Sequence, residues 1–209
     1  MSDLESMRIE RTDVHLLPVI KGLKSEAMKV QEAFEKVRPD KMVISLSKEE
    51  LEGLRNMPDD FEPMLTRYDE MYARGLGAFG EVAIPPPCYV AAVEIADRAG
   101  IPLVPVDLEE EVYTELYCAA VDGFTLFRHS TRTWLLRRKN FRSRTAEEFV
   151  KAWDLTVNKF EGFRRIERER AASIAKGIES NASGSTRLLA VVEFERAGEV
   201  TELLRGNKK

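Results

Sequence analysis

The chain has 209 residues, of which 44% are hydrophobic and 33% are charged, and its formal net charge is −4. This composition is typical of a globular protein with a sizeable core, and the slight acidity gives no overall attraction to nucleic acid or to a membrane surface. No apolar run approaches the roughly 20 residues that a membrane-spanning helix needs, and the acidic amino terminus lacks the apolar run of a signal peptide. We therefore expect a cytoplasmic protein that forms a single domain over residues 1–209.

The first third of the chain alternates strand and helix patterns. Ser47 and Glu50 have the spacing of a capping box, which predicts the start of a helix. The glycine-rich segment after residue 74 lacks the spacing of a phosphate-binding loop, so we interpret it as a turn. The expected elements are two strands of a hairpin, a helix, a third strand and two further helices, over residues 7–10, 14–19, 23–37, 42–46, 47–54 and 64–72.

The segment of residues 80–108 predicts a helix followed by a buried strand. Three consecutive prolines suit a loop that leads into a helix, and Gly100 stands where the left-handed residue after a helix is expected. Residues 101–106 form a short apolar run, whose two prolines favour the edge of a sheet. Asp107 follows this strand. The simpler interpretation is an N-cap for a helix that begins near Glu109, and the alternative is a ligand site at the carboxyl end of the strand.

The remaining sequence predicts a mostly helical segment followed by one more strand. Residues 109–140 predict one or two helices, with a boundary near Asp122-Gly123, and Thr145 opens a further long helix. We interpret these two segments, residues 109–179, as a helical hairpin inserted into the sheet domain. Residues 188–194 predict a buried strand, and residues 198–205 a closing helix. The expected fold is therefore α/β, with a central mixed sheet flanked by helices. The apolar stripe of the second long helix suggests a surface for a homodimer.

Cysteine and histidine usage limits the chemistry. Cys88 and Cys118 are the only cysteines, and their apolar helical surroundings predict buried thiols in a reducing compartment. His15 and His129 are the only histidines, which argues against a metal site built on several imidazoles. We expect neither a metal nor a cofactor.

The segment from Arg128 to Arg144 is strongly basic. It holds seven arginines and lysines, no acid, and interleaved aromatic residues. Such a pattern can follow a nucleic-acid backbone. The interpretation that we prefer is a solvated helix face, because the acidic total charge gives no general bias toward nucleic acid. The candidate contacts for the nucleic-acid alternative are Arg132, Arg137, Arg138, Lys139 and Arg142.

Four short motifs accompany this order of elements. They are Arg38-Pro39-Asp40 before a strand, the segment VAAVEIADRAGIPLVPVD at residues 90–107, Glu169-Arg170 followed by Ile174-Ala175, and the run Leu189–Val192. In these motifs, and in the order of its elements over about residues 7–206, the chain resembles the TraB/PrgY family. That family is related to the Tiki and GumN proteins and to the wider erythromycin-esterase/ChaN-like group. The resemblance implies one α/β domain with an inserted helical segment.

The chain departs from the family at the positions that matter for its chemistry. Members tend to carry Gly-x-x-His after the first strand, Glu after the second and Gly-x-x-His after the last, residues associated in Tiki-like proteins with metal-dependent peptidase activity. Here these positions read Pro18–Lys21, Ser45 and Glu193–Arg196. Lysine and arginine are cationic at neutral pH and are poor metal ligands. The resemblance therefore implies a degenerate member that lacks the metal–histidine chemistry of the family.

The resemblance also implies that several charged side chains converge at one edge of the sheet. Two cations there could recognise a small anionic ligand, or they could pair with neighbouring acids and seal the cleft, which is the interpretation that we prefer. The tentative ligand-binding residues are Lys21, Glu81, Asp107, Glu169, Arg170, Glu193 and Arg196.

Three functional hypotheses remain. The first is a non-catalytic binding or regulatory module, whose partner is an anionic small molecule or a protein. The second is a hydrolase or anion-binding enzyme rebuilt around Lys21, Glu81, Asp107 and Arg196, with Glu81 or Asp107 as the base. The third is nucleic-acid binding through the basic segment. An enzyme should show an open cleft in which a carboxyl group of raised pKa lies beside a cation, whereas a module should show a filled cleft and an exposed apolar patch elsewhere.

Overall fold

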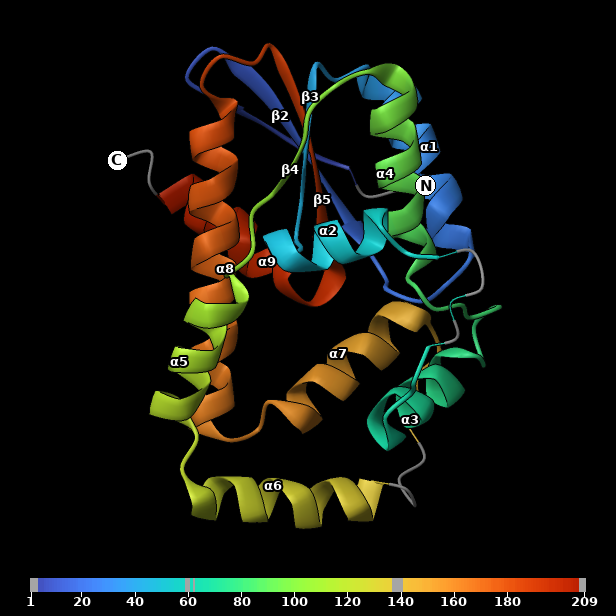
Figure 1. Ribbon diagram of the computed structural model, residues 1–209, viewed down its shortest axis with the longest axis vertical. Coiled ribbons are helices and arrows are strands. Elements are labelled where there is room, and N and C mark those ends of the chain that lie inside the picture. Colours follow the sequence, from blue (N-terminus) through green and yellow to red (C-terminus); the bar gives the residue numbers. More distant parts are fainter. Residues whose placement is uncertain (1–3, 59–60, 62, 137–140, 207–209) are drawn as a thin grey trace.

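The structure is a computed structural model that describes residues 4–58, 61, 63–136 and 141–206, with the backbone alone for residues 130–136. The described chain forms a five-stranded sheet with helices on both faces (Figure 1). This confirms the predicted α/β class. In chain order the elements are β1 (Glu5–Ile9), β2 (Thr12–Val19), α1 (Ser25–Val37), β3 (Lys41–Ile44), α2 (Lys48–Arg55), α3 (Arg67–Leu76), α4 (Pro87–Ala99), β4 (Leu103–Pro105), α5 (Glu110–Ala120), α6 (Gly123–Leu136), α7 (Ala146–Val157), α8 (Glu161–Ala182), β5 (Arg187–Glu193) and α9 (Phe194–Gly206).

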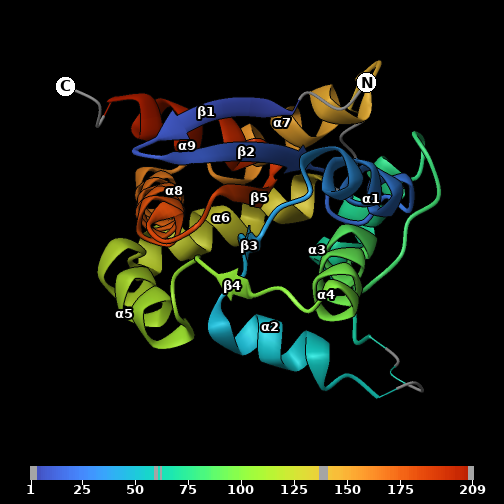
Figure 2. The ribbon, with the colours of Figure 1, turned by 90° about the horizontal axis from the view of Figure 1, so that it is seen from above.

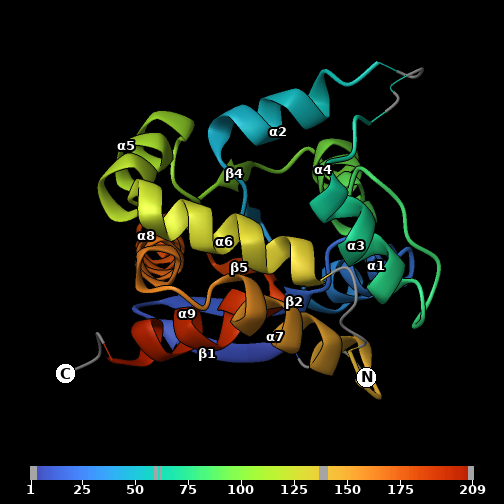
Figure 3. The ribbon, with the colours of Figure 1, turned by 90° about the horizontal axis from the view of Figure 1, so that it is seen from below.

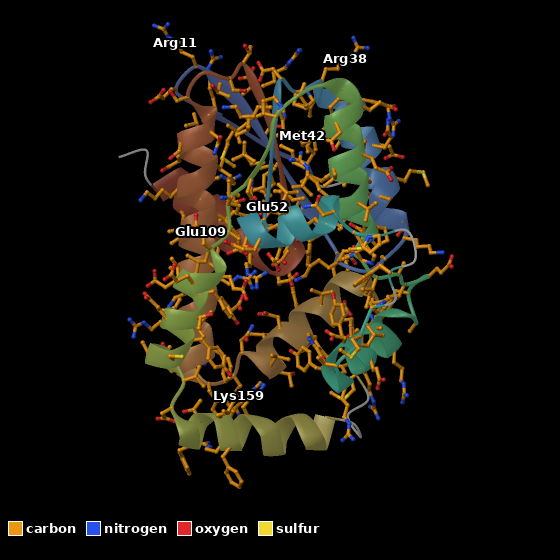
Figure 4. All side chains as sticks on the ribbon, in the orientation of Figure 1. Arg11, Arg38, Met42, Glu52, Glu109 and Lys159 are labelled. Atoms are coloured by element: carbon orange, nitrogen blue, oxygen red, sulfur yellow. The ribbon has the colours of Figure 1, made fainter. Side chains whose placement is uncertain are left out.

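The sheet is mixed, with the strand order β1-β2-β5-β3-β4 (Figure 2). The hairpin strand β1 runs antiparallel to β2, and the other neighbouring strands are parallel. The proline-containing strand β4 lies at the edge, as its prolines predicted. The parallel strands all end on the same side of the molecule, which we call the carboxyl edge. Arg11 and Arg38 mark the opposite end of the sheet, whereas Lys159 lies toward the end occupied by α6 (Figure 4).

Strand alternation divides the core between the two faces of the sheet. In β5, Leu189 and Val191 face α1 and α4, whereas Leu188, Ala190 and Val192 face α8 and α9. All five side chains are fully buried, as expected for a parallel strand covered on both faces. Burial of each leucine or valine contributes about 1.5–3 kcal/mol. The packing of helices on both faces of the sheet therefore fixes the positions of the residues at the carboxyl edge.

A third apolar cluster lies beyond the carboxyl edge. It is built mainly from α3 and α7, and α6 crosses the near side of this layer (Figure 3). The ring of Phe149 packs against bare backbone of α3, because a Cβ at Gly75 would stand 2.4 Å from two of its ring carbons. Phe149 also contacts the rings of Tyr72, Phe141 and Trp153. This cluster makes a cap over the ends of the strands.

The predicted helical segment of residues 109–179 is helical in its described part, and the boundary expected near Asp122-Gly123 separates α5 from α6. The single long helix expected from Thr145 is wrong, because it is broken at residues 158–160 into α7 and α8. The apolar stripe explains the break, because it serves two surfaces: Phe149 and Trp153 pack in the third cluster, whereas Ile174 and Ile178 pack on the sheet. Most of the stripe is therefore buried within this chain, and the rest of it is half-buried. A homodimer stays a prediction. The apolar stripe that suggested it is not an exposed surface in the described structure.

The two cysteines differ in their surroundings. Cys88 is fully buried between α4 and the sheet, and burial raises the pKa of its thiol to about 12. Cys118 is exposed, which corrects the prediction of two buried thiols, because none of the residues of α5 is buried. Among the described helices, none has both the length and the apolar composition that crossing a membrane requires.

Candidate functional site

The carboxyl edge gathers the residues that follow each parallel strand. Lys21 stands two residues after β2, Ser45 follows β3, Asp107 follows β4, and Glu193 ends β5. Because β5 continues directly into α9, the first turn of that helix also lies at this edge. The helix after β5 covers one face of the sheet, whereas the helix after the adjacent β2 covers the other. Ligands of open α/β sheets bind at such a reversal.

A chain of ion pairs runs across the edge from β4 toward α9. The carboxylate of Asp107 accepts hydrogen bonds from Nε and Nη2 of Arg170, the latter over 2.5 Å. Glu167 lies between two arginines, with Oε1 3.7 Å from Nη1 of Arg170 and Oε2 2.5 Å from Nη2 of Arg196. The side chains of Asp107 and Arg196 are 2% and 8% exposed, so these pairs are held out of water.

The series of ion pairs continues from Arg196 to Lys21, which follows β2. Arg196 pairs with Glu193, and the other carboxylate oxygen of Glu193 lies 2.6 Å from Nζ of Lys21. Oε1 of Glu195 lies 4.0 Å from both Lys21 Nζ and Arg196 Nη1. We call these seven side chains the charge network: Lys21, Asp107, Glu167, Arg170, Glu193, Glu195 and Arg196.

Polar contacts from the core hold two corners of the charge network in place. The amide of Glu193 donates a hydrogen bond to Oγ of Ser45 over 3.2 Å, and this oxygen lies 3.2 Å from the hydroxyl of Tyr89. The carboxylate of the buried Glu26 accepts a hydrogen bond from the amide of Ile20 over 3.0 Å. Because these contacts fix the backbone after β2 and at the end of β5, Lys21 and Glu193 meet in a defined geometry.

A cavity of about 690 Å³ opens above the charge network. Its floor includes five members of the network together with Asp154 of α7, and aromatic rings line much of its wall. The ring centroids of Tyr68 and Tyr72 lie 5.0 and 5.5 Å from that of Trp153. The volume falls in the range of sites for small organic molecules, which combine apolar walls with a few fixed polar groups.

Burial shifts the titration of three groups around this cavity. It is the largest influence on Glu195 and raises the pKa of this carboxyl, although Lys21 and the amino end of α9 act in the opposite direction. Burial and then the charge of Glu167 raise the pKa of Asp154. Burial lowers the pKa of Lys21, against the influence of Glu195. The surroundings of the cavity therefore disfavour the charged form of its carboxyl groups and of the lysine amino group.

The structure brings together five of the residues that the sequence singled out: Lys21, Asp107, Arg170, Glu193 and Arg196. It places the other two elsewhere. Glu81 is 73% exposed and pairs with Lys24, and Glu169 is exposed on α8. The N-cap interpretation of Asp107 is wrong, because the N-cap of α5 is Glu109 and Asp107 instead binds Arg170.

Sequence reasoning missed Glu167, Glu195, Asp154 and the aromatic wall. One signal was present: Glu167 and Glu193 each stand three residues before an arginine, a spacing that places opposite charges side by side. This spacing is equally common on solvated helices, so it does not reveal burial. Glu195 had a weaker signal, its place in the helical turn that directly follows a buried strand.

The basic segment lies mostly outside what the structure describes. Arg137, Arg138 and Lys139 fall outside the described residues, and so does the side chain of Arg132. Arg142 is described and exposed. Nucleic-acid binding through this segment stays a hypothesis from the sequence.

The fold and site define a class: an α/β protein with a buried charge network beneath a cavity at the carboxyl edge of its sheet. Comparison with models of known protein families and with curated proteins gives no match. Membership of the TraB/PrgY family therefore stays a prediction from the motifs quoted above. Over the described residues, no three His, Cys, Asp or Glu side chains come together as ligands for a metal ion.

Replacing Glu195 should reveal the cost of its buried charge. The ordinary pKa of a glutamate is 4.5, and burial raises it in the folded protein, so the unfolded chain releases this proton at lower pH than the folded chain does. Stability therefore falls as pH rises from about 4.5 through the folded pKa, and the loss persists above it. Glu195→Gln removes this loss. In urea unfolding we expect the variant to match the wild type near pH 4 and to exceed its stability near pH 8.

The matched control is Glu199→Gln, which neutralises an exposed carboxylate one turn further along α9. Its unfolding should show no comparable gain as the pH rises. An unfolding difference for Glu195→Gln that is constant with pH, or that favours the wild type near pH 8, would contradict the assignment of a raised pKa to Glu195.

Proposed function

We propose that the protein binds a small organic molecule in the cavity at the carboxyl edge, and that the charge network forms the polar base of this site. The observation that carries the proposal is the cavity of about 690 Å³ above side chains that are already paired and are buried or half-buried. The sequence favoured a sealed cleft. The cations do pair with acids, yet the space above them stays open.

Preorganisation supports a binding role. Lys21 and Arg196 are fixed by carboxylates before any ligand arrives, so a ligand does not have to order them. Buried ion pairs contribute little net stability compared with apolar side chains of similar volume. A region that served packing alone would be at least as stable with an apolar floor, whereas a ligand site gains orientation from fixed charges.

Acid–base catalysis in the same cavity is the second candidate. Glu195 has a raised pKa and lies 4.0 Å from Lys21, whose pKa burial lowers. Neighbouring groups shifted in this way are suited to exchange a proton with a substrate. Glu81 lies outside the cavity lining, and Asp107 is held by hydrogen bonds from two nitrogens of Arg170, so neither suits the role of base that the sequence suggested. This observation favours Glu195 for that role.

A degenerate relationship to the TraB/PrgY family is part of the proposal. The strand order, the helices on both faces and the position of the motifs are compatible with it. In this view, Lys21, Ser45 and Arg196 occupy positions that carry metal-site residues in the family, and ligand recognition by the charge network replaces the chemistry of that site. A regulatory role for the bound state fits the same view.

The test is a search for the ligand on the full chain, with a blocked cavity as control. Ala73→Trp places an indole in the cavity, whereas Ala119→Trp places one on the exposed face of α5. We expect compounds from a metabolite library to stabilise the wild type and Ala119→Trp, by about 2.7 kcal/mol at a hundredfold excess over Kd. Ala73→Trp should not respond.

Mass spectrometry of the bound compound separates the two candidate functions. A ligand recovered unchanged indicates a binding protein, and a converted ligand indicates an enzyme. If the library stabilises Ala73→Trp as strongly as the wild type, or stabilises neither protein, the cavity is not a ligand site and the proposal fails.

A further inference from the structure

We infer that the ligand of this cavity is an organic cation, with an ammonium or guanidinium group attached to an apolar body. This inference rests on the proposed function and names the class of molecule that the site takes. The balance of charges around the cavity favours this class of ligand. Five carboxylates, from Asp107, Asp154, Glu167, Glu193 and Glu195, meet three cations, from Lys21, Arg170 and Arg196. The charge network and Asp154 together therefore carry two negative charges in excess.

Each cation of the site already forms an ion pair with a carboxylate, and Nε of Arg196, which is buried without a hydrogen bond to the described residues, belongs to a guanidinium that is already paired. Arg170 is bound by Asp107, Arg196 by Glu167 and Glu193, and Lys21 by Glu193. An anionic ligand would have to displace one of these buried partners, which would leave a carboxylate unpaired at a cost of several kcal/mol. The charge network therefore argues against the small anionic ligand that the sequence suggested.

Two carboxylates remain for a ligand. Oε1 of Glu195 lies 4.0 Å from the nearest cations, and its Oε2 is buried without a hydrogen bond from the described residues. Asp154 accepts a hydrogen bond from the amide of Asn158 over 2.7 Å and forms no ion pair within the described part of the chain. A donor that carries positive charge would satisfy both carboxylates and remove the excess charge.

The wall of the cavity complements the same class of ligand. Tyr68 and Tyr72 pack against Trp153, which adjoins Asp154 in the sequence, and Phe163 also lines the cavity. Faces of aromatic rings attract ammonium and guanidinium groups and also bury apolar carbon. A cationic head directed to Glu195 and Asp154, with its apolar body against these rings, uses both features of the cavity.

The test compares three probes of similar shape and different charge: phenylbutylamine, phenylbutanol and phenylbutyrate. By isothermal titration calorimetry on the full chain at neutral pH, the amine should bind about tenfold or more tightly than the alcohol, and the carboxylate most weakly. Glu195→Gln and Asp154→Asn should each weaken the amine by about tenfold and leave the affinity for the alcohol unchanged. Glu199→Gln should bind all three probes like the wild type.

The outcomes separate this inference from the proposed function. If the alcohol or the carboxylate binds as tightly as the amine, or if both neutralising variants keep the affinity for the amine, the cation inference is overturned while ligand binding in the cavity stands. If none of the probes binds, both fail.

Discussion

Replacing Arg196 with Met should destabilise the protein by about 3–5 kcal/mol, because it leaves the buried carboxylate of Glu193 and the half-buried carboxylate of Glu167 without their shared cation. The side chain of Arg196 is 8% exposed and that of Glu193 is 2% exposed, so water cannot replace the lost partner. For a chain of this length the loss corresponds to a fall in Tm of about 6–20 °C. Thermal and urea unfolding of the full chain measure it.

Two comparisons make this result specific to the charge network. Arg168→Ala breaks an exposed ion pair with Glu161 on α8 and should unfold like the wild type. Adding Glu167→Gln and Glu193→Gln to Arg196→Met should restore most of the stability, because neutral side chains carry no unpaired charge. If Arg196→Met unfolds like Arg168→Ala, or if the triple variant is no more stable than the single one, the ion pairs are not buried in the way described.

Replacing Phe149 with Ala should cost a similar amount, about 3–5 kcal/mol, through loss of buried area and the cavity left behind. Phe149 is 1% exposed, and its ring stacks on the backbone of α3 and contacts the rings of Tyr72, Phe141 and Trp153. α3 and α7 supply most of the residues of the third cluster, which forms the cap over the carboxyl edge. Urea unfolding gives the loss, and near-ultraviolet circular dichroism should show altered packing of Trp153.

The control lies on the same helix. Leu155 is 74% exposed, so Leu155→Ala should change stability by no more than about 0.5 kcal/mol. The Phe149→Ala variant should also lose the response to cavity ligands, because the wall that includes Tyr72 and Trp153 depends on this ring. A Phe149→Ala protein that is as stable as Leu155→Ala would mean that the third cluster does not hold the cap in place.

The sequence predicts the sheet domain well because its signals are local. Ser47 and Glu50 form the predicted capping box, and Gly100 adopts the left-handed conformation that ends α4. The two prolines around Val104 exclude β4 from the interior of the sheet. The break at residues 158–160 has no such signal, since the apolar period continues through it. The break arises from tertiary packing. The apolar stripe packs in the third cluster before the break and on the sheet after it.

The candidate site was only partly predictable for a related reason. Lys21, Asp107 and Glu193 stand at the ends of parallel strands, so topology alone brings them to one edge. Asp154 and Glu167 come from helices whose direction depends on that break. Glu81 was misplaced because its neighbouring prolines gave no register, and it lies on the surface with Lys24. Residues fixed by strand ends are predictable from sequence, whereas those supplied by the cap are not.

The proposed function requires an open cavity in which a ligand contacts the charge network. The most direct measurement is a crystal structure of the full chain soaked with phenylbutylamine. We expect density for the amine in the cavity, with its nitrogen within hydrogen-bond distance of Glu195 and Asp154 and its ring beside Tyr72 and Trp153. A cavity filled by the chain's own side chains, or density for the probe only outside it, would contradict the account.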